Sequence, residues 1–164
     1  MRALVLGVSV LALLTLYVTW TAGRLDRLHA RVDASWAALD AQLVRRAAAA
    51  RAVAAHLDDP ETGRTLAQAA SASLEGTVDR REGLENDLSR ALKVSLPLLV
   101  QDAAGEAARA ELETASTRVG LARSFHNAAV RDTREIRLRR LPRALRLAGH
   151  RELPGYFEID DTGS

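Results

Sequence analysis

The sequence predicts an all-α protein, with an N-terminal transmembrane helix that runs into an elongated antiparallel four-helix bundle. Alanine, which has the highest helix propensity, is the most abundant residue (31 of 164). Residues that favour strands are scarce, and the four prolines and ten glycines cluster at the ends of the expected helices. Aromatic residues make up only 4% of the chain. This composition predicts closely packed helices and a slim bundle without a wide pocket.

The chain opens with 21 consecutive uncharged residues, from Ala3 to Gly23. At about 1.5 Å per residue, a helix of this length crosses the roughly 30 Å of bilayer hydrocarbon. Tyr17 and Trp20 stand where interfacial aromatic residues are usual. We therefore expect residues 1–23 to be a transmembrane anchor and the protein to be single-pass.

A cleaved secretory leader is the competing interpretation of the same segment. Arg2 followed by an apolar run is also typical of a signal peptide, but a signal core is usually about 7–15 residues long. Thr19 and Thr21 make only a weak cleavage site. The chain has no cysteine, which leaves the compartment open. A secreted or periplasmic helical binding protein with a cleaved leader remains the alternative.

The first soluble helix is expected to continue directly from the anchor. Asp58, Asp59 and Pro60 end it, which makes one helix of about 50 residues and a rigid stalk. Asp59 as N-cap and Pro60 at the first helical position then begin the next helix. One helix face carries the apolar residues at steps of three or four: Leu25, Leu28, Val32, Trp36, Leu39 and Leu43.

Two shorter helices are predicted next, over residues 60–79 and 82–96. The first has a thin apolar stripe, and Gly76 weakens its end. The second has a leucine at every fourth position and ends before Pro97. From the end of the first helix into the second runs a series of alternating charges that predicts a solvated helical face: Asp79, Arg80, Arg81, Glu82, Glu85, Asp87 and Arg90. The pattern leaves open whether these two segments are separate helices or one continuous arm.

The longest regular segment is expected over residues 103–141. Its apolar positions follow a seven-residue repeat: Leu112, Ala115, Val119, Ala122, His126, Ala129, Thr133 and Ile136. The stripe predicts a core histidine at position 126, and a repeat of this length also supports a homo-oligomer. Residues 24–150 then form an antiparallel bundle, and residues 151–164 form a partly disordered tail.

The basic residues gather toward the end of the fourth helix. Residues 118–151 hold ten arginines against two acidic residues, whereas residues 24–117 and 152–164 are net acidic. Five arginines lie among leucines and are the candidate residues for docking an anionic lipid or an acidic protein partner: Arg137, Arg139, Arg140, Arg143 and Arg146. The alternative is that these arginines only form the solvent-exposed end of a helix, where the helix dipole favours cations. Nucleic acid is disfavoured, because no aromatic residues are interleaved and no known module is present.

The sequence provides no candidate catalytic, cofactor-binding or metal-binding residues. The four histidines are far apart, and neither a nucleophile elbow nor a glycine-rich phosphate loop is present. His56 near Asp58 and Asp59 is better explained by capping and by the helix dipole than by a metal. We therefore expect neither an enzyme nor a small-molecule substrate.

The charges that flank the anchor favour a cytoplasmic soluble domain. Arg24, Arg27 and Arg31 follow the apolar run, whereas only Arg2 and the amino terminus precede it. Because lysine and arginine near a span favour the cytoplasmic side, the C-terminal side is predicted to face the cytoplasm.

Four motifs in order resemble those of the LemA family of bacterial membrane proteins. The first is RLDRLHARVDASWAALDAQLVRR, the second LSRALKV, the third ELETASTRVGLARSFHNAAVR and the fourth GHRELPGYFE. The chain departs from the family pattern at His126, where a tyrosine is usual, and in the alanine-rich run after Arg46. The resemblance implies a membrane-held four-helix bundle in the cytoplasm, and it supplies no catalytic residues.

These observations predict a membrane-anchored helical scaffold or adaptor that acts through protein or lipid contacts. If the second and third helices are separate, an up-down order returns the fourth helix to the bilayer. The basic end would then reach the membrane surface.

Overall fold

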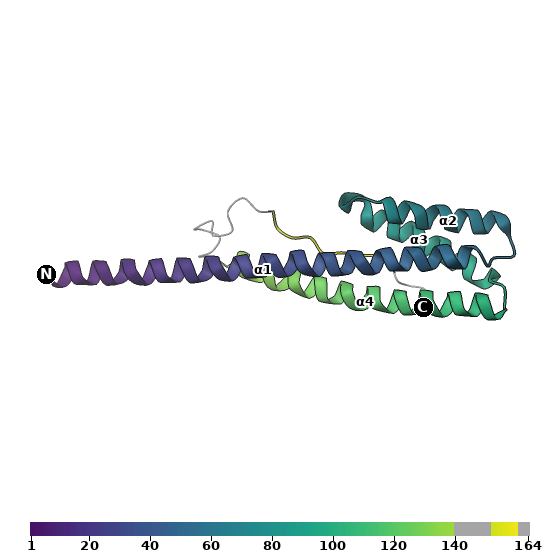
Figure 1. The fold of residues 1–164 in the computed structure, drawn as a ribbon. Coiled ribbons are helices and arrows are strands. Elements are labelled where there is room, and N and C mark those ends of the chain that lie inside the picture. The colour runs from purple at the N-terminus through teal and green to yellow at the C-terminus, as the bar shows by residue number, and fades with distance from the viewer. Residues whose placement is uncertain (140–151, 161–164) are drawn as a thin grey trace. The chain divides into compact units, whose positions relative to one another are not determined.

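The computed structural model describes residues 1–139 and 152–160. These residues form four α-helices and two short 3₁₀ turns, Val78–Arg80 and Leu96–Leu98, which confirms the all-α fold class (Figure 1). The helices are α1 (Arg2–Ala54), α2 (Pro60–Glu75), α3 (Arg81–Ser95) and α4 (Ala103–Arg137). Within the described residues, the only β-pairing is an isolated bridge between Leu57 and Leu99.

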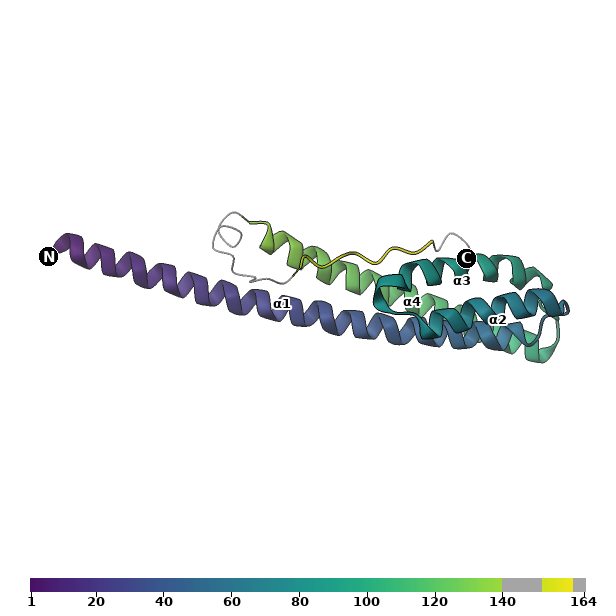
Figure 2. The same ribbon diagram turned by 90° about the horizontal axis from the view of Figure 1, so that it is seen from above.

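The chain divides into two compact units, each built from two separated segments. Met1–Ser35 and His126–Tyr156 form the first, which we call the anchor unit. Trp36–Phe125 and Phe157–Ser164 form the second, which we call the core unit. Helices α1 and α4 each contribute residues to both units, and within each unit they run side by side (Figures 1 and 2).

Helix α1 is 53 residues long, as its periodicity predicts. Near the N-terminus it is long and apolar enough to cross a membrane, and none of its most apolar window is buried within the protein. A signal sequence shares these properties. Beyond the apolar run the predicted stripe turns inward: Leu25, Val32, Leu39 and Leu43 are all buried.

The core unit holds a four-helix apolar core. Leu66 and Ala70 of α2, Leu88 and Leu92 of α3, and Leu112 of α4 are buried together with alanines and Val53 of α1. Because these side chains come from all four helices, no helix of this unit can hide its apolar face without the others.

Helices α2 and α3 are separate and antiparallel, which excludes a single continuous arm. Ser73 near the end of α2 contacts Glu85 in the second turn of α3. Along α1, Asp40 meets Arg81 and Arg46 meets Glu85, so α3 runs in the same direction as α1. The helices therefore alternate in direction along the chain.

Helix α2 begins as predicted but ends four residues early, at Glu75. The Asp59 carboxylate accepts hydrogen bonds from the backbone N–H groups of Glu61 and Thr62. Together with the Thr62 hydroxyl, these bonds lower the pKa of Asp59. At the other end, Gly76 is extended, and Leu84 packs so closely against it that a Cβ atom would clash. The expected extension to residue 79 was wrong because this contact turns the chain into α3.

The end of α4 also differs from its prediction. The helix stops at Arg137, and residues 140–151 lie outside the described part of the chain. Most of the predicted amphipathic basic stretch therefore falls outside the described residues. The heptad stripe is confirmed up to Ile136, since all of its positions are buried except Ala122, which is half-buried.

Candidate functional site: the basic end of the anchor unit

The last turns of α4 lie beside the part of α1 that follows the apolar run. Arg31 forms an ion pair with Asp132 at 3.4 Å, and His29 contacts Arg137 at 3.5 Å. His29 is six residues beyond Gly23, which is about 9 Å along a helix axis. The anchor unit thus brings Arg137 close to the end of the apolar run. A small apolar cluster of Val32, Ala129 and Val130 packs the two helices together.

His29 positions the Arg137 guanidinium. The imidazole is 6% exposed, and its Nδ1 lies 2.8 Å from the Leu25 carbonyl oxygen. A carbonyl oxygen can only accept, so Nδ1 carries the proton and Nε2 is left as an acceptor. Nε2 then accepts from Nη1 of Arg137. This arrangement places one arginine against the part of α1 that follows the apolar run.

Two arginines of α4 hold the extended segment that follows residue 151. Arg134 donates to the Pro154 carbonyl at 3.0 Å, and its guanidinium lies 5.4 Å from the centre of the Tyr156 ring. Arg137 donates to the Glu152 carbonyl. Residues 152–156 are therefore bound to α4 through two backbone oxygens and through the ring of Tyr156.

Arg24 lies directly after the apolar run of α1. Its guanidinium lies 5.6 Å from the centre of the Trp20 ring, in the last turn of the apolar run. Tryptophan and arginine are both common where a span leaves the hydrocarbon, because each combines an apolar body with a polar group.

His126 is a buried, hydrogen-bonded core histidine, as the stripe predicts. It is 4% exposed, its Nδ1 lies 3.2 Å from the Ser35 hydroxyl, and it forms a hydrogen bond with the Gly155 backbone. Burial lowers its pKa, since a charged imidazolium would lose its hydration there. The residue thus joins α1, α4 and the segment held by Arg134.

Of the five predicted docking arginines, the structure describes two. Arg137 has the internal contacts given above, and Arg139 pairs with Glu135 at 2.9 Å with both side chains exposed. Arg140, Arg143 and Arg146 lie outside the described residues. Sequence reasoning missed His29 and Arg134. The spacing of Leu25, His29 and Val32 could have revealed the first, because it places the histidine on the buried face.

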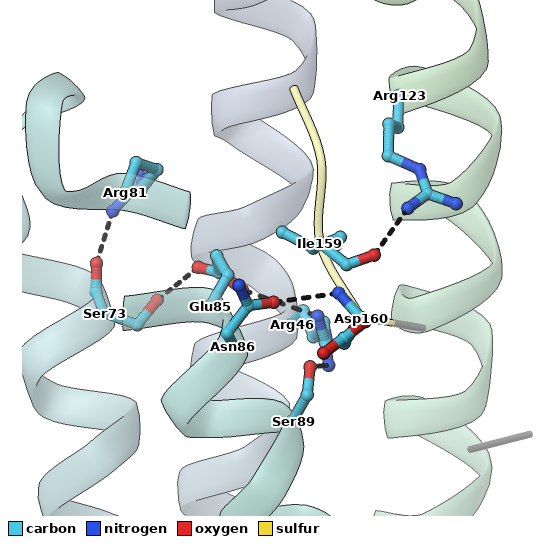
Figure 3. A network of polar contacts seen from close by, with 9 residues as sticks. All are labelled: Arg46, Ser73, Arg81, Glu85, Asn86, Ser89, Arg123, Ile159 and Asp160. Carbon is cyan, nitrogen blue, oxygen red and sulfur yellow. Dashed lines mark hydrogen bonds and ion pairs between the residues drawn. The ribbon is translucent and has the colours of Figure 1, made fainter. Parts of the chain in front are cut away.

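A second polar cluster lies inside the core unit. Arg46 donates to the Ser89 hydroxyl at 2.7 Å and pairs with Glu85 at 3.5 Å, and Glu85 accepts from the Ser73 hydroxyl (Figure 3). Arg81 donates to the Ser73 carbonyl and to Asp40.

The prediction of a solvated charged face was wrong for Arg81 and Glu85, which are 3% and 0% exposed. Both are buried because α1 and α2 supply partners for them. Burial nevertheless raises the pKa of Glu85, against the opposing effects of Ser73 and Arg46.

The described tail segment also occupies the core unit. Phe157 and Ile159 are buried, and the Trp36 and Phe157 rings meet edge to face at 5.5 Å. Figure 3 shows the segment passing between α3 and α4, where Arg123 donates to the Ile159 carbonyl at 2.9 Å. The Asn86 side chain accepts from the Asp160 backbone N–H.

The described residues include no group of three or more histidine or acidic side chains that could hold a metal ion. The comparisons with known proteins returned no matching family model, curated protein or solved structure. The resemblance to the LemA family thus rests on the sequence motifs.

Proposed function

We propose that the protein is a membrane-anchored helical scaffold or adaptor of the LemA type, whose basic end docks onto anionic lipid headgroups. The observation that carries this proposal is the contact between His29 and Arg137, which ties the basic end of α4 to α1 just beyond the apolar run. In this mechanism α1 crosses the bilayer, and α4 returns toward it. The bundle is then presented at a defined height for a partner protein.

The distance supports lipid as the docking surface. Arg137 contacts a residue about 9 Å along α1 from the apolar run. This is within the Debye length of about 10 Å at 0.1 M salt, so the charge acts on headgroups without full screening. Near an anionic leaflet each basic residue contributes about 1 kcal/mol. An acidic protein is the alternative partner for the same arginines, and the cytoplasmic orientation follows the charges beside the span.

The absence of cysteine allows a direct test on the full chain. A spin label on Leu138→Cys, at an exposed position beside the basic end, reports its depth in nanodiscs by its accessibility to oxygen and to a polar nickel reagent. We expect the label to approach the headgroups when phosphatidylserine is present. Neutralising Arg137, Arg139, Arg140, Arg143 and Arg146 to glutamine should reverse this. A label on Leu121→Cys, also exposed on α4, should not respond.

Equal label depth in neutral and anionic nanodiscs would overturn the lipid-docking proposal. The proposal would also fail if the five glutamine substitutions left the depth of the Leu138→Cys label unchanged in anionic nanodiscs.

The leader alternative has its own test. A cleaved leader would remove the part of α1 that contains Thr21, which is buried in the anchor unit. We therefore expect mass spectrometry of the mature protein to find the N-terminal residues in place. A mature chain that begins near Gly23 would favour the secreted or periplasmic binding protein instead.

A further inference from the structure

The core unit contains an open cleft that the scaffold function does not use. It has a volume of about 730 Å³ and is lined mainly by α3 and α4, with Arg46 from α1 and Asp160 from the tail. Ligand clefts of about 300–1,000 Å³ are typical of small-molecule sites. The sequence predicts no wide pocket from its alanine content. None of the described residues that line the cleft is alanine.

The charge of the lining favours an anion. The lining has two acidic side chains, Glu113 and Asp160. It has four cationic ones: Arg46, Arg90, Lys93 and Arg109. Arg46 and Arg90 pair with Glu85 and Asp87, which lie outside the lining. Among the described residues, neither Lys93 nor Arg109 has a carboxylate partner, and Arg109 donates only to the Leu96 carbonyl. Two cations are therefore available to a ligand.

Two of these arginines also have a buried donor. Within the described part of the chain, the Nε atoms of Arg46 and Arg109 have no hydrogen-bond partner, and the Arg46 side chain is only 7% exposed. Buried polar groups are nearly always hydrogen-bonded, so an unmet donor on each of two arginines of one cleft is unusual. After a small rotation of these two side chains, a ligand with several oxygen atoms would accept a hydrogen bond from each Nε–H group.

The lining also includes three leucines, Leu92, Leu96 and Leu112, of which Leu92 and Leu112 are buried. We propose that the cleft binds an amphipathic anion, a carboxylate or phosphate headgroup that meets Lys93 and Arg109 while a short apolar chain covers these leucines. This site is independent of lipid docking by the anchor unit. It would make the core unit responsive to a fatty acid or a phosphomonoester.

The test uses the full chain in zwitterionic nanodiscs, with empty nanodiscs as the blank, and calorimetric titration of four probes. Hexyl phosphate and hexanoate carry the proposed chemistry, inorganic phosphate lacks the chain, and hexyltrimethylammonium reverses the charge. We expect one saturable site for at least one of the first two, and the tighter one identifies the headgroup. Inorganic phosphate should bind at least about tenfold more weakly, and the cation should not bind.

Substitutions locate the site. Lys93→Gln and Arg109→Gln should each weaken binding about tenfold, because each removes a charged hydrogen-bond donor. Arg64→Gln, on the exposed face of α2, is the control. Gly120 lines the cleft, and a Cβ atom there meets nothing within 4 Å. Gly120→Leu should therefore fold and block the site.

The matched variant is Gly83→Leu. A Cβ atom at Gly83 also meets nothing within 4 Å, and Gly83 lies on α3 but is not among the residues that line the cleft. It should bind like the unmodified chain. The proposal fails if neither hexyl probe binds beyond the blank, or if Gly120→Leu binds as tightly as Gly83→Leu. It also fails if inorganic phosphate or the cation binds as tightly as the hexyl anions. Because the label depth at Leu138 depends on neither variant, failure here leaves the docking proposal intact.

Discussion

The two units hold α1 by different ion pairs, with α3 as the partner in the core unit and α4 as the partner in the anchor unit. In the core unit, an ion pair from α1 is buried, with Arg46 and Glu85 7% and 0% exposed. In the anchor unit, the corresponding pair of Arg31 and Asp132 is 59% and 44% exposed. The core unit also has a large apolar cluster from all four helices, whereas the anchor-unit cluster has three residues. The comparison indicates that the core unit supplies most of the folding free energy and that the anchor unit depends more on polar contacts.

The largest effect should come from breaking the buried pair. Arg46→Met leaves the Glu85 carboxylate in the core without its main cation, which should lower the free energy of unfolding by about 3–5 kcal/mol. Arg31→Met removes an exposed pair of the same type and should cost at most about 1 kcal/mol. Urea unfolding of the full chain in detergent, followed by circular dichroism, measures both. Equal losses would contradict the proposed division between the units.

Apolar truncations should sharpen the same contrast. Leu88→Ala, at a fully buried position of the core unit, should lower the free energy of unfolding by about 2–5 kcal/mol. Val130→Ala, equally buried in the anchor unit, removes the equivalent of two methylene groups and should cost about 1.5–2 kcal/mol.

Hydrogen exchange separates local from global opening for these variants. Val130→Ala should speed exchange in residues 126–137 while leaving the core-unit amides of α4 protected. Leu88→Ala should speed exchange throughout the core unit. If Val130→Ala deprotects the core unit equally, the two units do not open independently.

The smallest effect is an opposite response of the units to acid. Because burial lowers the pKa of His126 below its usual 6.5, the unfolded chain takes up this proton first. The contribution of His126 to stability is complete above pH 6.5. It is lost as the pH falls from 6.5 through the lowered pKa of the folded chain. The pKa of Glu85 is raised above its usual 4.5, so the folded chain holds that proton more tightly. Its contribution is complete below pH 4.5 and is lost as the pH rises through the raised pKa.

Urea unfolding as a function of pH tests these signs, since each unit of pKa difference corresponds to about 1.4 kcal/mol. His126→Gln should remove the loss of stability on the acid side of pH 6.5. Glu85→Gln should remove the loss that accompanies rising pH above 4.5. Slopes of the same sign for both groups would show that burial does not control one of them.

The helices that depend on local periodicity could be predicted from the sequence. The stripe from Leu25 to Leu43 and the heptads from Leu112 to Ile136 predict α1 and α4, because a helix presents every third or fourth residue on one face. The cap at Asp59 is equally local. For the candidate site, the sequence indicated the basic end but not His29 or Arg134, whose roles depend on partners about 100 and 20 residues away.

The partners of the buried charges depend on the tertiary structure. Arg81 and Glu85 lie at helical spacing from the buried Leu88, whereas the exposed Arg90 lies off that face of α3. The spacing does not supply partners for the two buried charges. Those partners come from α1 and α2, which bring Asp40, Arg46 and Ser73 to the face of α3 that holds Arg81 and Glu85. A charged side chain can be buried only where another element supplies its partner, and that pairing is not encoded in the periodicity of a single helix.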